Sequence, residues 1–491
     1  MPDESLTPGQ PPPDQPRIGV DEWVASVEGK RERYSGVVGR FRRVWDALPV
    51  GGRLLVFVIP AAIFPLVTTE GNLFRYGLIT LLYALLALGL NVVVGFAGLL
   101  DLGYIAFFGF GAYMYGILAS GHAGRHWPAE LAIPVVIAGG ALLGLLVGLP
   151  SRRLIGDYLA IVTLFFGQAF VVFVNNANRI NFPFIGHTDL TGGANGLDNI
   201  DPLNLFGWTV TTTKDYYYFT LGAFVLVMTL LYFVNQSRTG RAWRALREDP
   251  LAAEVMSMPI NRLKLMAFVF GAATAAFAGS IYGSVQTGAF PGDFDVGLLI
   301  TIYAIVILGG AGSLAGVIVA AIIVNAVPEL LRDANQAEWV FFVGLTVVVF
   351  ARVRPWPRLV AVVAGTIGLG FAIHAIADAV WPRLTAGSSG GEGALAHAVE
   401  SWVLLPSDPK QIANVAFGIL IAAVLGLTLI HGVWRTVALV PTIYLACFVW
   451  ENLLIQQTAG ATRFLLLGAL LVVLMNARPQ GLFGTARVEI V

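Results

Sequence analysis

The stretch LITLLYALLALGLNVVV, residues 78–94, contains no charged side chain and is almost wholly apolar. Similar uncharged runs occupy residues 131–149, 217–234 and 464–475. A helix needs about 20 apolar residues to cross the hydrocarbon core of a bilayer, and several of these runs approach that length. The whole chain of 491 residues is 57% hydrophobic and 12% charged, whereas a soluble domain carries about 25% charged residues. The sequence therefore predicts an all-α fold, a polytopic bundle of membrane helices.

Arginine positions predict the path of the chain, because cytoplasmic loops hold the excess of Lys and Arg. Arginine clusters recur near 40–53, 152–153, 238–247, 352–358 and 478–487, with apolar segments between them. This alternation predicts about 12–14 membrane segments, some short enough to be re-entrant, with both termini in the cytoplasm. The segments are expected near 54–69, 76–94, 106–119, 131–149, 158–174, 217–234, 264–283, 297–310, 314–327, 339–351, 359–380, 413–431, 436–455 and 463–476.

Two glycine-rich breaks interrupt apolar segments at membrane depth: GFAGLLDLG at 95–103 and GGAGS at 309–313. Irregular backbone at that depth is tolerated only where it is buried in protein or lines a cavity. Paired broken segments of this kind point to the substrate pathway of a transporter. Asp101 lies inside the first break, where a charge is costly unless it faces the pathway or finds a partner. Glycines that allow close helix crossing, and an Asp101 that only caps a broken helix, are the structural alternatives.

The charged stretch SRTGRAWRALREDPLAAEVMSMPINRLKL, residues 237–265, is predicted on the cytoplasmic side. It divides into a helix over 239–248 and a second helix that Asp249 caps, with Pro250 at its first position. The second helix carries a small apolar face of Ala252, Ala253, Val255 and Met256. A positively charged cytoplasmic loop would need the arginines but not this capped helix. The face is suited to a groove on a soluble partner.

The sequence offers no catalytic or metal site. The chain has four lysines, at 30, 214, 264 and 410, and none completes the GxxxxGK[ST] phosphate-binding loop. His122 and His126 are four residues apart but lack a third ligand. If ATP drives this protein, the ATPase is another polypeptide.

The segment REDPLAAEVMSMPINRLKL, 247–265, closely resembles the coupling loop of LivM-like permeases, the membrane subunits of branched-chain amino acid ABC transporters. Further segments resemble the same family: NVVVGFAGLLDLGYIAFFGFGAY at 91–113, DYLAIVTLFFGQ at 157–168, TGGANGL at 191–197, VILGGAGSLAGVIVAAIIV at 306–324 and RFLLLGALLVVLMNARPQGLFG at 463–484. Together they cover roughly 75–335 and 460–485.

The resemblance implies a permease that works with a second homologous permease, two cytoplasmic ABC ATPases and an extracytoplasmic solute-binding protein. No cofactor is expected on this chain, and ATP and Mg would bind the ATPases. The segment that fits the ATPase cleft would comprise Arg247, Glu248, Asp249, Ala252, Ala253 and Glu254. The substrate pathway would include Asn91, Gly95, Gly98, Asp101, Tyr104, Gln168, Gly309 and Gly310. The outside loop would dock the binding protein through Thr191, Gly192, Gly193 and Asn195.

The sequence departs from the family at several positions. Asp101 and Tyr104 stand where Ser and His are common, Gln168 replaces a Glu, and Ser257 replaces a Gly. An additional stretch precedes the last family segment, and the ending of 339–357 resembles that of the terminal segment, by duplication or by convergence. The expected organisation is a disordered Pro-rich tail at 1–16, a basic amphipathic segment at 17–50 that lies on the membrane surface or is solvated, a core permease domain at 51–335 with its coupling loop at 238–259, a membrane-helix insertion at 336–461, and a terminal membrane helix with a basic tail at 462–491.

The expected function is that of the permease subunit of an ATP-driven importer for branched-chain or related amino acids in the bacterial inner membrane. A permease for urea or short amides is the nearest alternative, because related permeases handle such substrates. An ion-coupled secondary transporter is the alternative from another class. It would leave the coupling loop unexplained, and it would rest mainly on Asp101, since buried acids are few.

Overall fold

The computed structural model describes most of the chain: residues 50–154, 156–182, 186–353, 355–389, 393–430 and 432–455, and then 468, 469, 471, 472, 475 and 480–483. The predicted tail at 1–16, nearly all of the amphipathic segment at 17–50 and most of the terminal segment at 462–491 lie outside these residues. The chain forms two compact units, Met1–Ile63 and Phe64–Val491. The described part of the first unit is the start of helix α3 (Val50–Val67).

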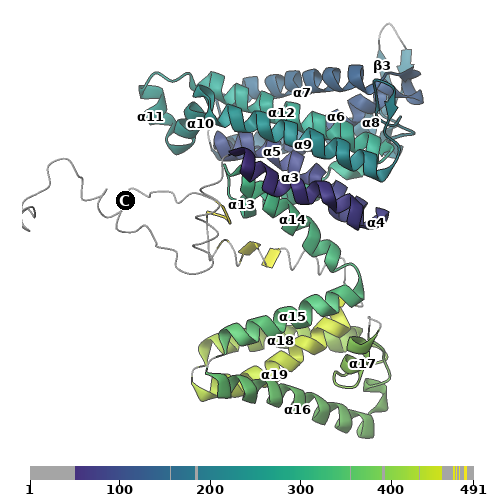
Figure 1. Ribbon diagram of the computed structural model, residues 1–491, viewed down its shortest axis with the longest axis vertical. Helices are drawn as coiled ribbons and strands as arrows, with labels where there is room; N and C mark the ends of the chain where they lie inside the picture. Colours follow the sequence, from purple (N-terminus) through teal and green to yellow (C-terminus); the bar gives the residue numbers. More distant parts are fainter. Residues whose placement is uncertain are drawn as a thin grey trace, which may run out of the picture. The chain divides into compact units, whose positions relative to one another are not determined.

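Apolar helices dominate the described residues (Figure 1). Eight are long and apolar enough to cross a membrane. They are the continuous run Glu70–Phe96, which comprises α4 (Glu70–Asn72), η1 (Leu73–Leu78), α5 (Ile79–Leu90) and η2 (Asn91–Phe96), then α7 (Ala129–Ser151), α8 (Asp157–Asn176), α9 (Thr213–Gln236), α12 (Ile260–Val285), α16 (Trp356–Val380), α18 (Lys410–Leu429) and α19 (Val433–Val449) with η8 (Trp450–Ile455). The predicted all-α membrane bundle is confirmed.

The shorter predicted spans correspond to shorter apolar helices and to one bent pair of helices. Helices α14 (Leu314–Leu330) and α15 (Ala334–Arg352) would form a ninth crossing if counted together, but the chain bends by 116° between them. The shorter apolar helices are α3, α6 (Tyr104–Leu118) and α13 (Val296–Gly309). Each span predicted between residues 54 and 455 falls on one of these helices, and the bent pair confirms the expected broken helices.

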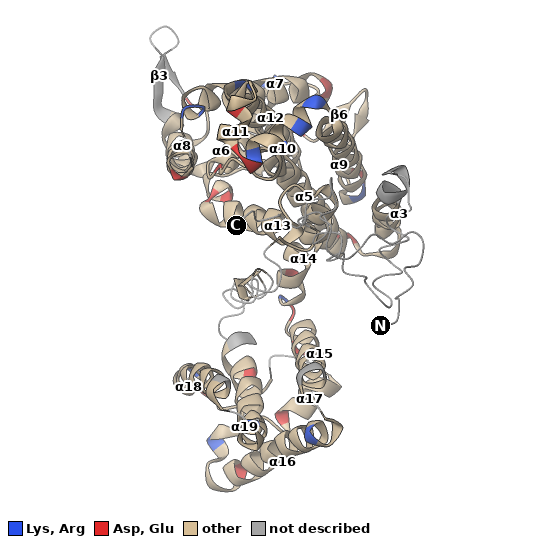
Figure 2. Ribbon diagram, turned by 90° about the vertical axis from the view of Figure 1, so that its left-hand side faces the viewer, with Lys and Arg blue, Asp and Glu red and all other residues tan. Residues whose placement is uncertain are grey.

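Short elements connect the helices. The helical ones are η3 (Gly121–Ala123), η4 (Ala177–Arg179), η5 (Gly193–Asn195), α10 (Arg238–Glu248), α11 (Pro250–Val255), η6 (Pro291–Phe294), η7 (Pro382–Leu384) and α17 (Ala394–Glu400). The strands are β1 (Ala119–Ser120), β2 (Arg125–His126), β3 (Ile180–Phe182), β4 (Gly186–Thr188), β5 (Leu197–Asp198), β6 (Asn204–Leu205), β7 (Trp208–Thr209) and β8 (Gly288–Ala289), paired antiparallel as β1–β2, β3–β4, β5–β8 and β6–β7. Charged residues are sparse along the long helices (Figure 2).

Helix α12 is packed closely on two sides by small residues. A Cβ atom added to Gly144 of α7 would lie 2.6 Å from Cβ of Ala272, and one added to Gly140 would lie 2.4 Å from Cβ of Ala276. On the α6 side, a Cβ atom added to Gly111 would lie 2.1 Å from the carbonyl oxygen of Ala276. Small residues let membrane helices approach until their backbones touch. Helix α12 is therefore held between α7 and α6 with no room for larger side chains at these crossings.

The helices after α14 build a hydrophobic core of their own. Its buried members are Val399, Val403, Ala413, Ala416, Cys447, Phe448, Val449 and Leu453. The ring of Phe341 on α15 stacks on Trp450 of η8, with centroids 4.3 Å apart and planes 9° apart. The predicted insertion therefore contains membrane-length helices that pack against one another. Its exact boundaries stay a prediction.

We expect Gly144→Ala to reduce stability by about 1–3 kcal/mol, because the added methyl group overpacks the α7–α12 crossing. The matched control is Gly222→Ala on α9, where nothing lies within 4 Å of an added Cβ atom. This control should leave stability unchanged or raise it, because alanine favours helix. Thermal unfolding of the purified protein in detergent measures both. Equal Tm values for the two variants would contradict the packing described here.

Candidate functional site

The predicted coupling segment forms two helices, as expected. The hydroxyl of Ser237 accepts a hydrogen bond from the Gly240 amide at 3.3 Å and caps α10, which ends at Glu248. One carboxylate oxygen of Asp249 accepts hydrogen bonds from the amides of Leu251 at 2.8 Å and Ala252 at 3.0 Å, and so caps α11. Pro250 takes the first helical position. These interactions confirm the predicted cap.

The backbone of Ser257, just after α11, is left-handed, with φ +61°. A residue with a side chain is strained in that conformation, whereas glycine adopts it freely. The chain therefore carries Ser at a position whose backbone favours Gly. The glycine that the family resemblance leads us to expect at this position would adopt this backbone without strain.

Helix α10 is anchored to the start of α12. Trp243 is fully buried, and its indole nitrogen donates a hydrogen bond to the carbonyl oxygen of Leu263 at 2.9 Å. Its ring meets Phe270 edge to face, with centroids 6.0 Å apart. Trp243 therefore joins α10 directly to α12.

Helix α11 and the residue after it present apolar side chains to the outside. Leu251, Val255 and Met256 are 73%, 84% and 74% exposed. Ala253, predicted on the same apolar face, is buried instead, and Leu251 takes its place in the exposed set. Figure 1 shows α10 and α11 at one end of the core helices, opposite the strand loops near β3. The exposed residues Leu251, Val255 and Met256 are called the α11 tip below.

The two glycine breaks lie against each other. The first joins η2 to α6, and the second joins α13 to α14. Asn91 is fully buried, and its side-chain oxygen accepts a hydrogen bond from the Gly312 amide at 2.8 Å. A Cβ atom added to Gly95 would lie 2.4 Å from the same amide nitrogen. The structure thus brings together two segments that are more than 200 residues apart in the sequence.

Arg247 joins the coupling segment to these breaks. One guanidinium nitrogen, Nη1, donates hydrogen bonds to the carbonyl oxygen of Gly95 in the first break and to that of Ala311 in the second, the latter at 3.1 Å. The side-chain stem passes Gly98, which has φ +70° and where an added Cβ atom would lie 2.8 Å from Cγ of Arg247. Arg247 was assigned to the coupling segment from the sequence, and its contact with the breaks had no sequence signal.

Asp101 is buried, and its side chain closes a local turn before α6 rather than capping that helix. One carboxylate oxygen accepts a hydrogen bond from the Gly103 amide at 3.0 Å, before the start of α6. Its backbone carbonyl accepts a hydrogen bond from the Tyr303 hydroxyl at 2.6 Å. The neighbouring Leu102 amide donates to the Thr163 hydroxyl at 2.9 Å. Tyr303 and Thr163 therefore shape the first break, although neither stood out in the sequence.

The other predicted pathway residues lie in different surroundings. Tyr104 is fully buried, and its hydroxyl donates to the carbonyl oxygen of Leu86 at 2.9 Å, so it joins α6 to α5. Gly309 ends α13 and Gly310 follows it with φ +96°. Gln168 is exposed on α8. The structure gathers Asn91, Gly95, Gly98 and the second break, and it leaves Gln168 on an exposed helix face.

A segment near the end of the chain returns to the second break. The amides of Leu482 and Phe483 donate to the carbonyl oxygens of Leu308 and Gly309 at 2.9 and 3.1 Å. The last carbonyls of a helix lack partners within the helix, and here a remote segment supplies them. Gly481, with φ +78°, allows this approach, since an added Cβ atom would lie 2.5 Å from the Gly310 nitrogen. The predicted terminal segment therefore contributes Leu482 and Phe483 to the core at the second break, and no feature of the sequence indicated this contact.

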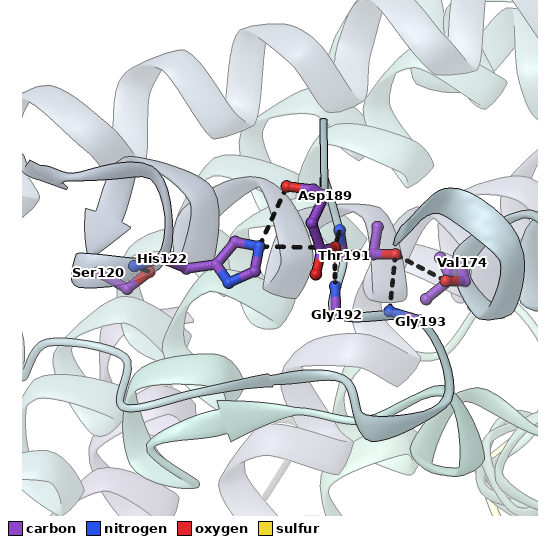
Figure 3. A network of polar contacts seen from close by, with 7 residues as sticks. All are labelled: Ser120, His122, Val174, Asp189, Thr191, Gly192 and Gly193. Carbon is purple, nitrogen blue, oxygen red and sulfur yellow. Dashed lines mark hydrogen bonds and ion pairs between the residues drawn. The ribbon is translucent and has the colours of Figure 1, made fainter. Parts of the chain in front are cut away.

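The predicted docking loop is held by a network of polar contacts (Figure 3). One carboxylate oxygen of Asp189 accepts hydrogen bonds from the amides of Gly192 at 2.7 Å and Thr191 at 3.2 Å. The Thr191 hydroxyl donates to the carbonyl oxygen of Val174 at 2.7 Å and accepts from the Gly193 amide at 3.3 Å. Asn195, the last predicted docking residue, is exposed. The loop is thus tied to the end of α8.

Two histidines connect this loop region to the α6–α7 connection. His122 Nε2 lies 3.2 Å from the carbonyl oxygen of Asp189, as Figure 3 shows, and His126 Nδ1 lies 2.6 Å from a carboxylate oxygen of Asp201. The two histidines therefore have different acidic partners. Within the described residues, no group of three or more His, Cys, Asp and Glu side chains could hold a metal ion.

Comparisons with known proteins show which family the chain resembles. The family described as "Branched-chain amino acid transport system / permease component" matches residues 72–352, which is more than half of the chain. The high-affinity branched-chain amino acid transport system permease protein LivM of Escherichia coli K12 is 34% identical over 317 residues, or 60% of this chain and 71% of that protein.

Two further relatives are less similar to this chain. The LivH permease protein of the Salmonella typhimurium high-affinity branched-chain amino acid transport system is 28% identical over 274 residues, or 51% of this chain and 82% of that protein. The fructose import permease protein FruG of Bifidobacterium longum is 24% identical over 234 residues, or 45% of this chain and 66% of that protein. No solved structure gives a significant match. The matched family and the eight apolar helices confirm the predicted resemblance and the multi-pass location in the inner membrane. The chain belongs to the family of branched-chain amino acid transport system permease components.

Proposed function

We propose that this chain is the permease subunit of an ATP-driven importer for branched-chain or related amino acids. In the proposed complex it works with a second homologous permease, two cytoplasmic ABC ATPases and an extracytoplasmic binding protein. ATP and Mg bind the ATPases, and this chain carries no cofactor. Both termini lie in the cytoplasm, as the arginine clusters predict.

The α11 tip carries the proposal. Exposed Leu251, Val255 and Met256 form a compact apolar surface at the end of a protein whose α10 is fixed to α12 by Trp243. Residues of the same segment, Glu248 and Glu254, are exposed beside it. An apolar helix face edged by charges suits a hydrophobic groove on a soluble partner. In this proposal the groove belongs to the ATPase, and its movement is transmitted to α12.

The end of α12 that is remote from α10 contacts the loop on which we propose that the binding protein docks. Strand β8, just after α12, pairs with β5 of the loop that contains Thr191, Gly192 and Gly193. The hydroxyl of Ser284 near the end of α12 donates to the carbonyl oxygen of Asp201 at 3.2 Å. A 26-residue helix is about 39 Å long. One helix therefore connects the proposed ATPase surface with the proposed docking loop.

The substrate is proposed at the level of its class. The LivM and LivH relatives are named for branched-chain amino acid transport, and FruG is named for fructose import. Uptake should therefore be tested with leucine, isoleucine and valine first, and then with urea, acetamide and fructose. The binding protein that co-purifies with the permease identifies the ligand directly, because its ligand can be measured in isolation.

We expect Leu251→Asp/Val255→Asp to abolish retention of the ATPases, because each change places a charge in the proposed apolar contact. The measurement is a pull-down of the tagged protein from native membranes in mild detergent. The matched control is Phe206→Asp/Trp208→Asp, at exposed apolar residues in the β6–β7 connection, which should retain the ATPases. A wild-type protein that captured no ATPase would overturn the proposed function.

We expect Asp189→Asn to weaken the response to the binding protein, since hydrogen bonds to a charged acceptor contribute about 1.5–3 kcal/mol each. The readout is ATP hydrolysis by the reconstituted complex as a function of binding-protein concentration, with an expected rise of about tenfold in the half-saturating concentration. Asp198→Asn on strand β5 is the control, because Asp198 is a nearby exposed acid. If Asp189→Asn instead reduced the amount of ATPase retained in the complex, the loop would act on assembly and the proposed docking role would be contradicted.

Asp101→Asn separates ATP-driven from ion-coupled transport. The amide oxygen of Asn can still accept the hydrogen bond from the Gly103 amide, so this local turn is kept while the acid is removed. We expect leucine uptake in proteoliposomes supplied with ATP to be largely retained. Loss of uptake together with a dependence of the wild-type protein on a proton or sodium gradient would favour the ion-coupled alternative.

A further inference from the structure

A single arginine side chain contacts both glycine breaks. Arg247 stands one residue before the end of α10, and its Nη1 donates to the carbonyl oxygens of Gly95 and Ala311. These two carbonyls belong to different breaks and to different broken segments. The side chain comes from a third element, the proposed coupling segment.

Two glycines lie against the Arg247 side chain, and a larger residue at either position would collide with it. A Cβ atom added to Gly312, where φ is +90°, would lie 2.9 Å from Nη1 of Arg247. One added to Gly98 would lie 2.8 Å from Cγ of the same side chain. Glycines at these two positions therefore accommodate the arginine stem and its head. Asn91, through the Gly312 amide, fastens the two breaks together beside it.

The hydrogen bonds explain why the position needs arginine. A broken helix leaves carbonyls without partners, and such groups are costly away from water. At the second break the carbonyls of Leu308 and Gly309 are paired with the amides of Leu482 and Phe483. The carbonyl of Ala311 is paired with Arg247 instead. Both hydrogen bonds start from Nη1, and the planar guanidinium holds the two N–H groups of that nitrogen in fixed directions, whereas the ammonium of lysine is a compact charge whose three donors rotate.

Arg247 lies on α10 between a buried anchor and the exposed α11 tip. Trp243 lies one turn before Arg247 and is fully buried against α12, while Leu251 lies one turn after it and is exposed. A force on the α11 tip therefore acts on one side of Arg247, and the fixed point at Trp243 lies on the other. Turning α10 about this fixed point displaces the guanidinium from the carbonyls.

We propose that Arg247 is a positioning residue that transmits movement of the coupling helices to the two broken segments. In one state of the transport cycle its guanidinium holds the carbonyls of Gly95 and Ala311 together. Displacement of α10 withdraws the guanidinium and lets the two breaks separate. The inference rests on the proposed function, because it takes the ATPases as the source of the force.

The test measures the coupling ratio, which is leucine imported per ATP hydrolysed. The complete complex is reconstituted in proteoliposomes with its ATPases, second permease and binding protein, and labelled leucine is the probe. We expect Arg247→Gln to lower the ratio about tenfold, because it removes a charged donor shared by two carbonyls. Arg247→Lys should give an intermediate ratio, since the charge remains but the planar fork is lost.

The matched control is Arg244→Gln. Arg244 lies one turn earlier on α10 and is exposed, and its Nη1 donates to the side-chain oxygen of Asn235 at 3.2 Å. This variant should keep the wild-type ratio. A merely structural role of Arg247 would reduce the yield of folded complex and leave the ratio of the remaining complex unchanged, so that result would overturn the inference.

Hydrogen exchange provides a readout that does not depend on transport. In the wild-type complex, trapping the ATPases with ATP and vanadate should change amide exchange in residues 95–103 and 310–313 together. In Arg247→Gln both segments should exchange faster before trapping and respond less to it. If the ATPases co-purify with Arg247→Gln but its amide exchange and coupling ratio match those of the wild type, the role proposed for Arg247 is overturned and the proposed function is not. Absence of ATPases from the wild-type complex would overturn the proposed function as well.

Discussion

Backbone carbonyls that lose their helical partners inside a membrane need new partners, and this constraint governs the core of the protein. The breaks after η2 and after α13 both create such groups. The protein supplies donors for these carbonyls from two distant places: the Arg247 guanidinium and the amides of Leu482 and Phe483. The side-chain oxygen of Asn91 pairs with a backbone amide instead, that of Gly312. The coupling segment and the returning C-terminal segment are therefore built into the same small region as the breaks.

Close packing around α12 gives this region a stiff support. Backbone contact at Gly140 and Gly144 on one side, and at Gly111 on the other, leaves little space for sliding or tilting relative to α7 and α6. The same helix begins beside the buried Trp243 and ends beside the β5–β8 pair. Rigid elements of this kind transmit displacement over a distance that flexible loops would absorb. At the breaks themselves, glycines adopt backbone conformations with positive φ.

The additional helices lie, in the sequence, between the second break and the residues that return to it. The family match ends at residue 352, in α15, and the helices α16–α19 follow it. Residues of α17, α18, α19 and η8 form an apolar core there. Leu482 and Phe483 nevertheless pair with the end of α13. A segment placed after the additional helices thus completes the second break. A long insertion is compatible with this arrangement because lengthening a connection costs little extra closure entropy, while the hydrogen bonds at its end remain the same.

The sequence by itself determined the apolar helices, the capped coupling segment and the location of both breaks. These features depend on composition and on local hydrogen bonding: 17 uncharged residues at 78–94 indicate a membrane helix wherever they stand, and Asp249 caps the helix that directly follows it. Only the tertiary structure decided that Arg247 reaches both breaks, that Tyr303 and Thr163 support Asp101, and that Leu482 pairs with α13. Those contacts join residues dozens to hundreds of positions apart, and no local pattern specifies which distant carbonyl a side chain will meet. Folding of the whole chain brings the partners together, so the reason these residues matter lies in three-dimensional proximity.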